Sequence, residues 1–415
     1  MKVGAIAWSK MRDASTFEFD PDFLKAGLDL SPIAIPLADI RRGKRLFSFP
    51  HLPKATFRGL PGLLADQLPD DFGNQIINSW LLRQGRDPAS FNPVERLCYI
   101  GMRGMGALEF LPVMDRTFAG SSRVELARLV ELSRDILESR DAFSTSLKDE
   151  DADAIQDIMK VGTSAGGAHA KAILAIHPES GEVRSGQIDA PEGFEHWLLK
   201  FDGVEGEDGK PGPEGRVEYA YHLMARACGI DMMECRLLEE GGRAHFMTRR
   251  YDRPGEGRKV HVQTLCAIAH LDYYQPSSYE QAFLVLRKLR LPATDADELY
   301  RRMVFNVCAR NLDDHTKNFS FMMDRKGTWR LAPAYDLTFA HGPNVKWHKL
   351  SVNGRRRDIS EEDMLAIGKE MNVKSRKRII EEVREGLLGW KGFANEAGLE
   401  PKLTDLIAKQ LTRKL

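Results

Sequence analysis

The chain has 415 residues, and its 60 Lys and Arg side chains are balanced by 60 Asp and Glu side chains, so its formal net charge is zero. This balance excludes bulk electrostatic attraction to nucleic acid or anionic lipid as the main role. Hydrophobic residues make up 42% and charged residues 29%, which is typical of globular proteins and excludes an extended disordered chain.

The five cysteines form no C-x-x-C pair, and their odd number argues against a disulfide framework or a zinc ribbon. We therefore expect the reduced thiols of a cytoplasmic protein. The apolar patch Val3–Trp8 is too short for the core of a signal peptide. No apolar run reaches the roughly 18 residues that cross a bilayer, so no membrane association is expected.

The first part of the chain predicts two strands and then a helix. Strands are expected at Val3–Trp8 and at Thr16–Asp20, where aromatic and polar side chains alternate. A helix is expected from the capping box Ser122–Glu125 to about Leu137. The charged stretch Lys148–Asp153 then predicts a boundary near residues 140–155.

The pattern next favours strands at Lys171–Ile176 and Trp197–Phe201. A helix follows, with apolar side chains at positions 217, 221, 224 and 228 on one face and Gly229 at its end. Beyond about residue 255 the chain reads as mainly helical, with apolar stripes at Leu299–Val307 and Ile379–Leu387.

One stretch in this later part carries a recognisable chemistry. The sequence N-L-D-D-H-T-K-N at Asn311–Asn318 follows a predicted helix that ends near Arg310. A predicted hairpin, Phe319–Leu331, comes next and leads to Tyr335 and Asp336. Helix, acidic loop, hairpin and Asp is the order of these elements in the C-lobe of a protein kinase.

The spacing within the loop assigns roles to individual residues. A kinase catalytic loop places its base Asp five positions before a metal-binding Asn. If Asn318 is that Asn, the spacing selects Asp313 over Asp314 as the catalytic base. Mg²⁺ prefers oxygen ligands, so Asn318 and Asp336 are the predicted metal ligands. Taken alone, this loop is equally explained as a polar turn that caps a helix.

Two features of the preceding half of the chain favour the kinase interpretation. The segment Val161–Gly167 precedes a strand, and Gly166 and Gly167 free backbone N–H groups to cradle phosphates, although an ordinary turn is the alternative. Lys200 ends a predicted strand like the lysine that holds the α- and β-phosphates, and Glu218 opens the next helix as its partner. Each alone reads as a surface residue, and the order of all these elements along the chain favours the kinase.

Two further loop residues have open roles. His315 either orients the loop or approaches the nucleotide phosphates, and Lys317 either neutralises phosphate charge or is solvated. We assign both to cofactor binding. The tripeptide Asp71-Phe72-Gly73 spells the D-F-G of kinases, but it precedes every other element, whereas the metal-binding Asp must follow the catalytic loop. We therefore exclude it from the site.

With these motifs in place, the chain resembles the HipA family of bacterial toxin kinases over nearly its whole length. The similarity is carried by Gly59–Asp70, Ser164–Lys171, Asp313–Ser320 and Pro333–Asp336. The resemblance implies an α+β, two-lobed protein-kinase-like fold with a small amino-terminal subdomain and a mainly helical C-lobe. We expect the amino-terminal subdomain at residues 1–145, the kinase N-lobe at 146–252 and the C-lobe at 253–415.

The resemblance also implies an activity. It implies a serine/threonine kinase that uses ATP and Mg²⁺, phosphorylates a translation component such as an aminoacyl-tRNA synthetase, and arrests growth. It implies a small helix-turn-helix antitoxin of the HipB type, which neutralises the kinase and alone brings it to operator DNA. In this family the glycine loop carries an inactivating autophosphorylated serine, which matches Ser164, with Thr163 beside it.

The chain departs from general kinase motifs at two points. Leu312 stands directly before Asp313, so there is no His-Arg-Asp, and Asp336 is followed by Leu337-Thr338. The second departure argues against regulation by a flip of a D-F-G phenylalanine.

Two other functions fit the sequence. A small-molecule kinase would share the ATP motifs. A pseudokinase subunit of a DNA-bound repressor would use the basic runs Arg355–Arg357 and Lys374–Arg378 against phosphates, although a solvated face explains these runs better. The intact set of Asp313, Asn318 and Asp336 favours an active enzyme.

Overall fold

The computed structural model describes residues 1–114, 129–130, 133, 170–187, 190–202, 212–340 and 346–411. The expected glycine loop, with Thr163, Ser164, Gly166 and Gly167, lies outside the described residues, as does most of the helix expected at 122–137.

The described chain forms two compact units, each assembled from separate segments. Unit 1 contains Met1–Asp66, Arg216–Met233 and Val262–Leu415, and unit 2 contains Gln67–Gly215 and Glu234–His261. The domain limits expected near residues 145 and 252 stay a prediction.

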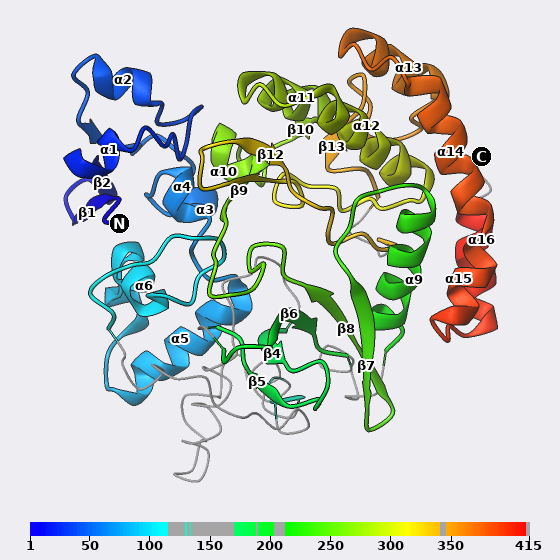
Figure 1. Cartoon of the computed structure of the whole chain (residues 1–415), viewed down its shortest axis with the longest axis horizontal. Helices are drawn as coiled ribbons and strands as arrows, with labels where there is room; N and C mark the ends of the chain where they lie inside the picture. The colour runs from blue at the N-terminus through cyan, green and yellow to red at the C-terminus, as the bar shows by residue number, and fades with distance from the viewer. Residues whose placement is uncertain are drawn as a thin grey trace. The chain divides into compact units, whose positions relative to one another are not determined.

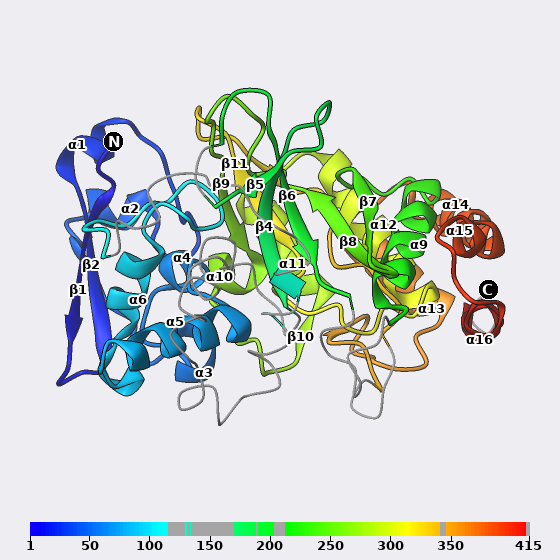
Figure 2. The same ribbon diagram turned by 90° about the horizontal axis from the view of Figure 1, so that it is seen from below.

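Unit 1 begins with a small antiparallel sheet, which Figure 2 shows in blue. Its strands are β1 (Gly4–Ser9), β2 (Ala14–Phe19) and β3 (Leu46–Phe47), in that order. Phe17 and Phe19 are buried whereas Glu18 between them is exposed, so the predicted alternation is confirmed. Four short helices accompany the sheet: α1 (Pro21–Lys25), α2 (Leu37–Arg41), α3 (Lys54–Phe57) and α4 (Gly62–Ala65).

The predicted helix over residues 217–228 is α9 (Glu214–Ala227). Its apolar stripe is buried, and the Tyr221 hydroxyl donates to the Ala309 carbonyl at 2.6 Å. A Cβ on Gly386 would lie 2.5 Å from the Cys228 sulfur, so glycine permits the chain after α9 to approach the later helix that holds Gly386.

The remainder of unit 1 combines helices with short strands, as Figure 1 shows from yellow-green to red. The helices are α10 (Leu265–Ala269), α11 (Tyr279–Lys288), α12 (Ala293–Cys308), α13 (Glu361–Glu370), α14 (Arg376–Leu388), α15 (Trp390–Glu396) and α16 (Pro401–Leu411). One sheet has the order β12 (Trp329–Leu331), β11 (Ser320–Met323), β9 (His261–Thr264), and β10 (Ser277–Ser278) pairs in parallel with β13 (Leu350–Ser351). The stripes predicted on α12 and α14 are buried, and the two helices pack together.

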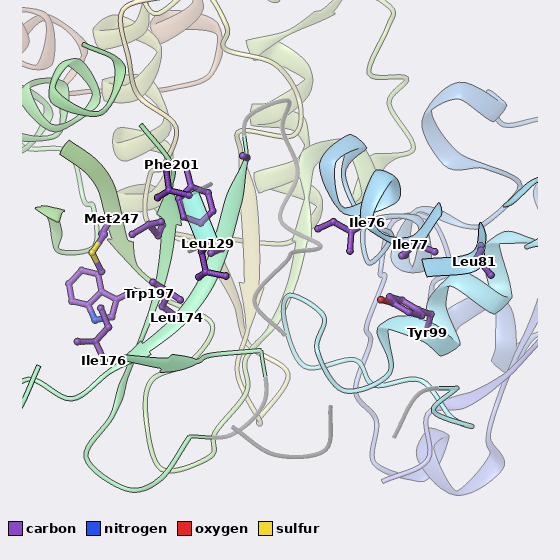
Figure 3. Packing of buried hydrophobic residues seen from close by; sticks show 14 of the residues in the cluster. Ile76, Ile77, Leu81, Tyr99, Leu129, Leu174, Ile176, Trp197, Phe201 and Met247 are labelled. Atoms are coloured by element: carbon purple, nitrogen blue, oxygen red, sulfur yellow. The ribbon is translucent and has the colours of Figure 1, made fainter. Parts of the chain in front are cut away.

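Unit 2 is built on a five-stranded antiparallel sheet of order β5-β4-β6-β8-β7. The strands are β4 (Lys171–Ile176), β5 (Val183–Ser185), β6 (Glu195–Lys200), β7 (Cys235–Glu240) and β8 (Arg243–Arg249). Helix α5 (Asp71–Arg83), the 3-10 turn η1 (Pro88–Ser90) and helix α6 (Pro93–Ile100) also belong to this unit. Its core, seen in Figure 3, unites Leu174, Trp197 and Met247 of the sheet with Ile77 and Tyr99 of the helices.

The excluded D-F-G tripeptide forms the first turn of α5. The Asp70 carboxylate caps this helix by accepting a hydrogen bond from the Gly73 amide at 2.7 Å. These residues therefore have a local structural explanation.

A buried ion cluster follows β8. Arg250 and Arg253 donate to the Asp252 carboxylate at 2.6 and 2.7 Å, and the Gly106 amide donates to it at 2.7 Å. Burial acts to raise the pKa of Asp252, but the two guanidinium groups outweigh it and hold the pKa well below its usual range. Arg253 also donates to the carbonyls of Gly104 and Gly106, so this cluster fixes a distant loop within unit 2.

All five cysteines are free thiols. Within the described ranges, no helix combines the length and the hydrophobicity needed to cross a bilayer.

Candidate functional site

The loop with the predicted catalytic residues leaves the buried end of α12. Arg310 adopts a left-handed conformation (φ 58°), and the Asn311 amide donates back to the Asn306 carbonyl at 3.0 Å. The Asn311 side chain also donates to the Asn306 side chain at 3.0 Å. Hydrogen bonds to a packed helix therefore fix the start of the loop.

The five-residue spacing closes a turn that brings Asp313 and Asn318 together. The backbone amide of His315 and the side-chain amide of Asn318 each donate to the Asp313 carbonyl at 2.9 Å. The Asn318 side-chain nitrogen is thus engaged, which leaves its oxygen as the atom for a cation. The Asp313 side chain is 47% exposed, so its carboxylate is accessible to a substrate.

The neighbouring Asp314 is completely buried and serves the fold. Its carboxylate accepts hydrogen bonds from the Tyr279 hydroxyl at 2.8 Å and from the Lys349 amide at 2.7 Å, and His348 Nδ1 lies 3.0 Å away. The Leu350 amide adds a longer contact at 3.4 Å. These partners occupy both oxygens, which supports the choice of Asp313 as the base.

The surroundings of His315 favour its neutral form. Burial lowers its pKa, and this effect outweighs the nearby carboxylates of Asp313 and Asp336, which act to raise the pKa. Its Nε2 lies 3.8 Å from the Asp313 carboxylate, too far for a hydrogen bond, and its ring packs edge-on against Tyr273. The Lys317 ammonium lies 4.9 Å from the centre of the same Tyr273 ring.

Asp336 follows the hairpin in a strained conformation. Its φ of 56° is uncommon for a residue other than glycine, and such strain is concentrated at functional sites. The Tyr335 hydroxyl donates to the Lys317 carbonyl at 2.7 Å, and the Ala334 amide donates to the Asp231 carbonyl at 2.8 Å. The first bond ties the hairpin exit to the catalytic loop, and the second ties it to the segment after α9. Asp336 also acts electrostatically on His315.

The donor set fits Mg²⁺ better than a transition metal. Among the described residues, no group of three or more His, Cys, Asp or Glu side chains converges as in a protein-only metal site. Mg²⁺ needs only one or two carboxylates because it keeps waters and binds substrate phosphates. That Asp336 and the side-chain oxygen of Asn318 supply this minimal set stays a prediction.

The amino-terminal motif Gly59–Asp70 binds the segment 264–270, which in turn holds this loop, a role that the sequence did not indicate. The Gly62 amide donates to His270 Nε2 at 2.9 Å, and the Asp66 carboxylate accepts from the amide and hydroxyl of Thr264 at 2.6 and 2.8 Å. Burial raises the pKa of Asp66, and Thr264 and Lys317 oppose that change. The amides that follow Thr264, at 265 and 266, donate to the carbonyls of residues 319 and 316 of the loop.

The predicted nucleotide lysine lies at the end of β6 in unit 2. Lys200 stands 5.7 Å from the centre of the Phe246 ring, and its cross-strand partner on β4 is Lys171, which is buried. Directly paired residues project from the same face of a sheet, so the two ammonium groups share that face. Glu218 is buried on α9. Its pairing with Lys200 stays a prediction, as do the roles of Gly166, Gly167, Ser164 and Thr163.

Comparisons with known proteins cover both halves of the chain. Residues 1–111 match the family described as HipA N-terminal domain, and residues 163–405 match the family described as HipA-like C-terminal domain. A chain from the solved Shewanella oneidensis MR-1 complex of the toxin–antitoxin system HipA, HipB and its operator DNA aligns with a TM-score of 0.67 at 16% identity, covering 99% of this chain and 93% of that one. This likeness confirms the expected α+β, protein-kinase-like fold. That the C-lobe is mainly helical stays a prediction.

Curated relatives match over shorter stretches. The Sinorhizobium fredii proteins "Putative kinase Y4mE" and "Putative kinase Y4dM" are 28% and 27% identical over 42% and 46% of this chain. A Haemophilus influenzae protein named "Putative kinase" is 27% identical over 31% of this chain. The matched regions span 39%, 51% and 43% of those three relatives, respectively.

Proposed function

This chain belongs to the HipA family, and from that premise we propose that it is an ATP- and Mg²⁺-dependent serine/threonine protein kinase that acts as a growth-arresting toxin. The observation that carries the proposal is the contrast between two adjacent carboxylates. Asp313 is exposed on a fixed turn with Asn318, whereas Asp314 is buried and fully engaged in the fold. A loop that served only to cap a helix would not need an accessible carboxylate in that position.

In this mechanism Asp313 accepts a hydrogen bond from the hydroxyl of the acceptor and orients it toward the γ-phosphate. Asn318 and Asp336 hold the metal through oxygen. When bound, Mg²⁺ neutralises the negative charge that develops on the transferring phosphoryl group. His315, which is mostly buried and favours the neutral form, offers a hydrogen-bond donor without adding charge, and Lys317 adds a positive charge to the same loop.

The remaining predicted nucleotide-binding residues have the following roles in this proposal. Lys200 binds the α- and β-phosphates, Glu218 positions it, and the amides around Gly166 and Gly167 cradle the phosphates. Phosphorylation of Ser164 or Thr163 adds about −1.5 to −2 charges to that loop, which repels ATP and inactivates the kinase.

We propose a small helix-turn-helix antitoxin of the HipB type as partner. The solved relative was crystallised as a complex of HipA, HipB and operator DNA, which supports this choice and an indirect contact with DNA. The proposed acceptor is a translation component such as an aminoacyl-tRNA synthetase.

The direct test incubates the purified chain with radiolabelled ATP, Mg²⁺ and a panel of aminoacyl-tRNA synthetases. We expect label on at least one synthetase and, by mass spectrometry, phosphate on Ser164 or Thr163. Both signals should disappear in Asp313→Asn. Label found only on small molecules would replace the protein kinase with a small-molecule kinase, and no transfer at all would support a pseudokinase in a repressor.

A further inference from the structure

A short segment of unit 1 combines strong positive charge with an exposed aromatic side chain. The segment Lys346–Arg357 contains five Lys or Arg residues and no Asp or Glu. Trp347 is 48% exposed, which is unusual for so large a side chain. The guanidinium carbons of Arg356 and Arg357 lie 6.0 and 5.6 Å from the centre of its ring. We call these three residues the Trp347 surface.

Hydrogen bonds between the two strands of the turn, around His348 and around Arg356, hold this surface in place. The His348 amide donates to the Arg356 carbonyl at 2.9 Å, and Arg356 Nε donates to the His348 carbonyl at 2.6 Å. The amides of Val352 and Arg355 close the turn by bonding to each other's carbonyls, at 2.8 and 2.9 Å. The basic side chains therefore project from a built turn.

The same segment is attached to the catalytic loop. The Asp314 carboxylate accepts a hydrogen bond from the Lys349 amide and contacts the His348 ring. Asp314 directly follows the proposed base Asp313 in the chain. Adjacent Cα atoms are about 3.8 Å apart. The segment that carries the Trp347 surface is therefore anchored one residue along the chain from the carboxylate that the acceptor hydroxyl must reach.

The charges of this surface are available to a partner. Arg355 lies 3.5 Å from the Asp363 carboxylate, whereas within the described part of the chain no carboxylate forms an ion pair with Arg356 or Arg357. Trp and Arg are the side chains most enriched in the energetic centres of protein interfaces. A solvated basic run would explain the positive charges by themselves. It does not explain why a half-exposed tryptophan lies against two arginines on a hydrogen-bonded turn.

We propose that the Trp347 surface docks acidic residues that flank the phosphoacceptor hydroxyl of the protein substrate. This inference rests on the proposed kinase function and adds to it the chemical class of the acceptor. Arginine forks pair with carboxylates, and the ring of Trp347 offers an apolar contact for the intervening peptide. The chain's zero net charge favours a local acidic segment over a nucleic acid, which needs an extended field.

The test uses two fluorescein-labelled serine peptides, one with four flanking glutamates and one with four glutamines. Binding is followed by fluorescence anisotropy with Mg²⁺ and a non-hydrolysable ATP analogue, so that it does not depend on transfer. Arg357→Glu removes a cation of the surface, and Lys377→Glu makes the same charge change at an exposed site on α14. Phosphate transfer to both peptides is measured in parallel.

We expect the wild-type chain to bind the glutamate peptide at least about tenfold more tightly than the glutamine peptide at low salt, and less selectively at high salt. Arg357→Glu should weaken glutamate-peptide binding about fivefold or more, and Lys377→Glu should leave it unchanged. Equal binding of the two peptides, or equal behaviour of the two variants, would overturn the proposal.

Two further results separate this inference from the function it rests on. Equal transfer to both peptides would refute the acidic preference while supporting the kinase. Selective binding of the glutamate peptide with transfer to no acceptor would contradict the kinase and leave the acidic preference standing.

One more outcome would overturn the proposed ligand. A single-stranded RNA that displaces the peptide, and whose binding is lost in Arg357→Glu, would assign the surface to nucleic acid.

Discussion

Asparagine substitutions at the two adjacent aspartates should separate catalysis from stability. Asp313→Asn changes a half-exposed side chain whose carboxylate lies 3.8 Å from Nε2 of the His315 ring and makes no hydrogen bond to it. Surface changes of this kind alter the free energy of unfolding by less than about 0.5 kcal/mol. Because the carboxylate would no longer accept the acceptor proton, the rate of phosphotransfer should fall by about 10² to 10⁴.

Asp314→Asn should instead destabilise the fold. The buried carboxylate binds the Tyr279 hydroxyl, His348 and the Lys349 amide, and burial together with Asp314 raises the pKa of Tyr279 well above its usual value, so this hydroxyl remains a donor. An amide keeps one acceptor oxygen and turns its NH₂ toward the other partners, which leaves a buried donor unsatisfied. That loss costs about 1–3 kcal/mol, and weaker bonds to a neutral group add to it, so we expect about 3 kcal/mol in all.

The assay is thermal unfolding of the two variants beside the wild type, followed by radiolabel transfer at a temperature where all are folded. A loss of about 3 kcal/mol corresponds to a fall of roughly 6–12 °C in Tm for a unit of this size, whereas Asp313→Asn should shift Tm by less than about 2 °C. If Asp314→Asn melts like the wild type, or if Asp313→Asn is the less stable of the two, our assignment of their roles is wrong.

Three further predictions follow from the packing and the charges. Gly62→Ala should lower the free energy of unfolding in urea by about 1–3 kcal/mol, because a Cβ there would lie 2.1 Å from the Ala267 carbonyl oxygen. The control Gly392→Ala, on open helix surface, should be neutral or stabilising by up to about 1 kcal/mol. Equal effects of the two substitutions would contradict this packing. Burial lowers the pKa of His222, His245 and His270 to about 4, so the unfolded chain binds more protons than the folded chain between pH 6.5 and about 4. The free energy of unfolding in urea should therefore be highest above pH 6.5 and decline as the pH falls, by up to about 3 kcal/mol for His245. A free energy of unfolding that does not change over this pH range would refute the neutral state of these histidines. Lys200→Met should raise the dissociation constant for ATP in calorimetric titrations by about tenfold or more, and an unchanged constant would move the phosphate-binding role to Lys171 on the same face of the sheet.

The elements that the sequence predicted correctly are those with strong local patterns. The alternation at β2, the apolar runs of β4 and β6, and the helical stripe of α9 each reflect burial of one face or of a whole strand. The pairing of Asp313 with Asn318 was also accessible, because five residues suffice to close the turn that the side-chain amide stabilises.

Contacts between distant residues left no local signal. Asp314 binds a segment 35 residues away, Gly62 binds His270 across 208 residues, and Gly106 binds Asp252 across 146. No periodicity or spacing links such partners, so the anchoring of the Trp347 surface and the support from Gly59–Asp70 emerged only from the structure. An alternation of charge such as Arg250, Asp252, Arg253 reads in sequence as a solvated turn, although the three are buried together.

The central claim is that the stretch from α12 to Asp336 is a magnesium-dependent phosphotransfer centre, and nucleotide binding with and without the metal tests it most directly. ATP is titrated into the wild-type chain and into Asp336→Asn by calorimetry, with Mg²⁺ present or chelated. We predict that Mg²⁺ strengthens ATP binding by the wild-type chain at least about tenfold and has little effect on Asp336→Asn. Equal strengthening by Mg²⁺ in both proteins, or no ATP binding by the wild-type chain, would contradict this account.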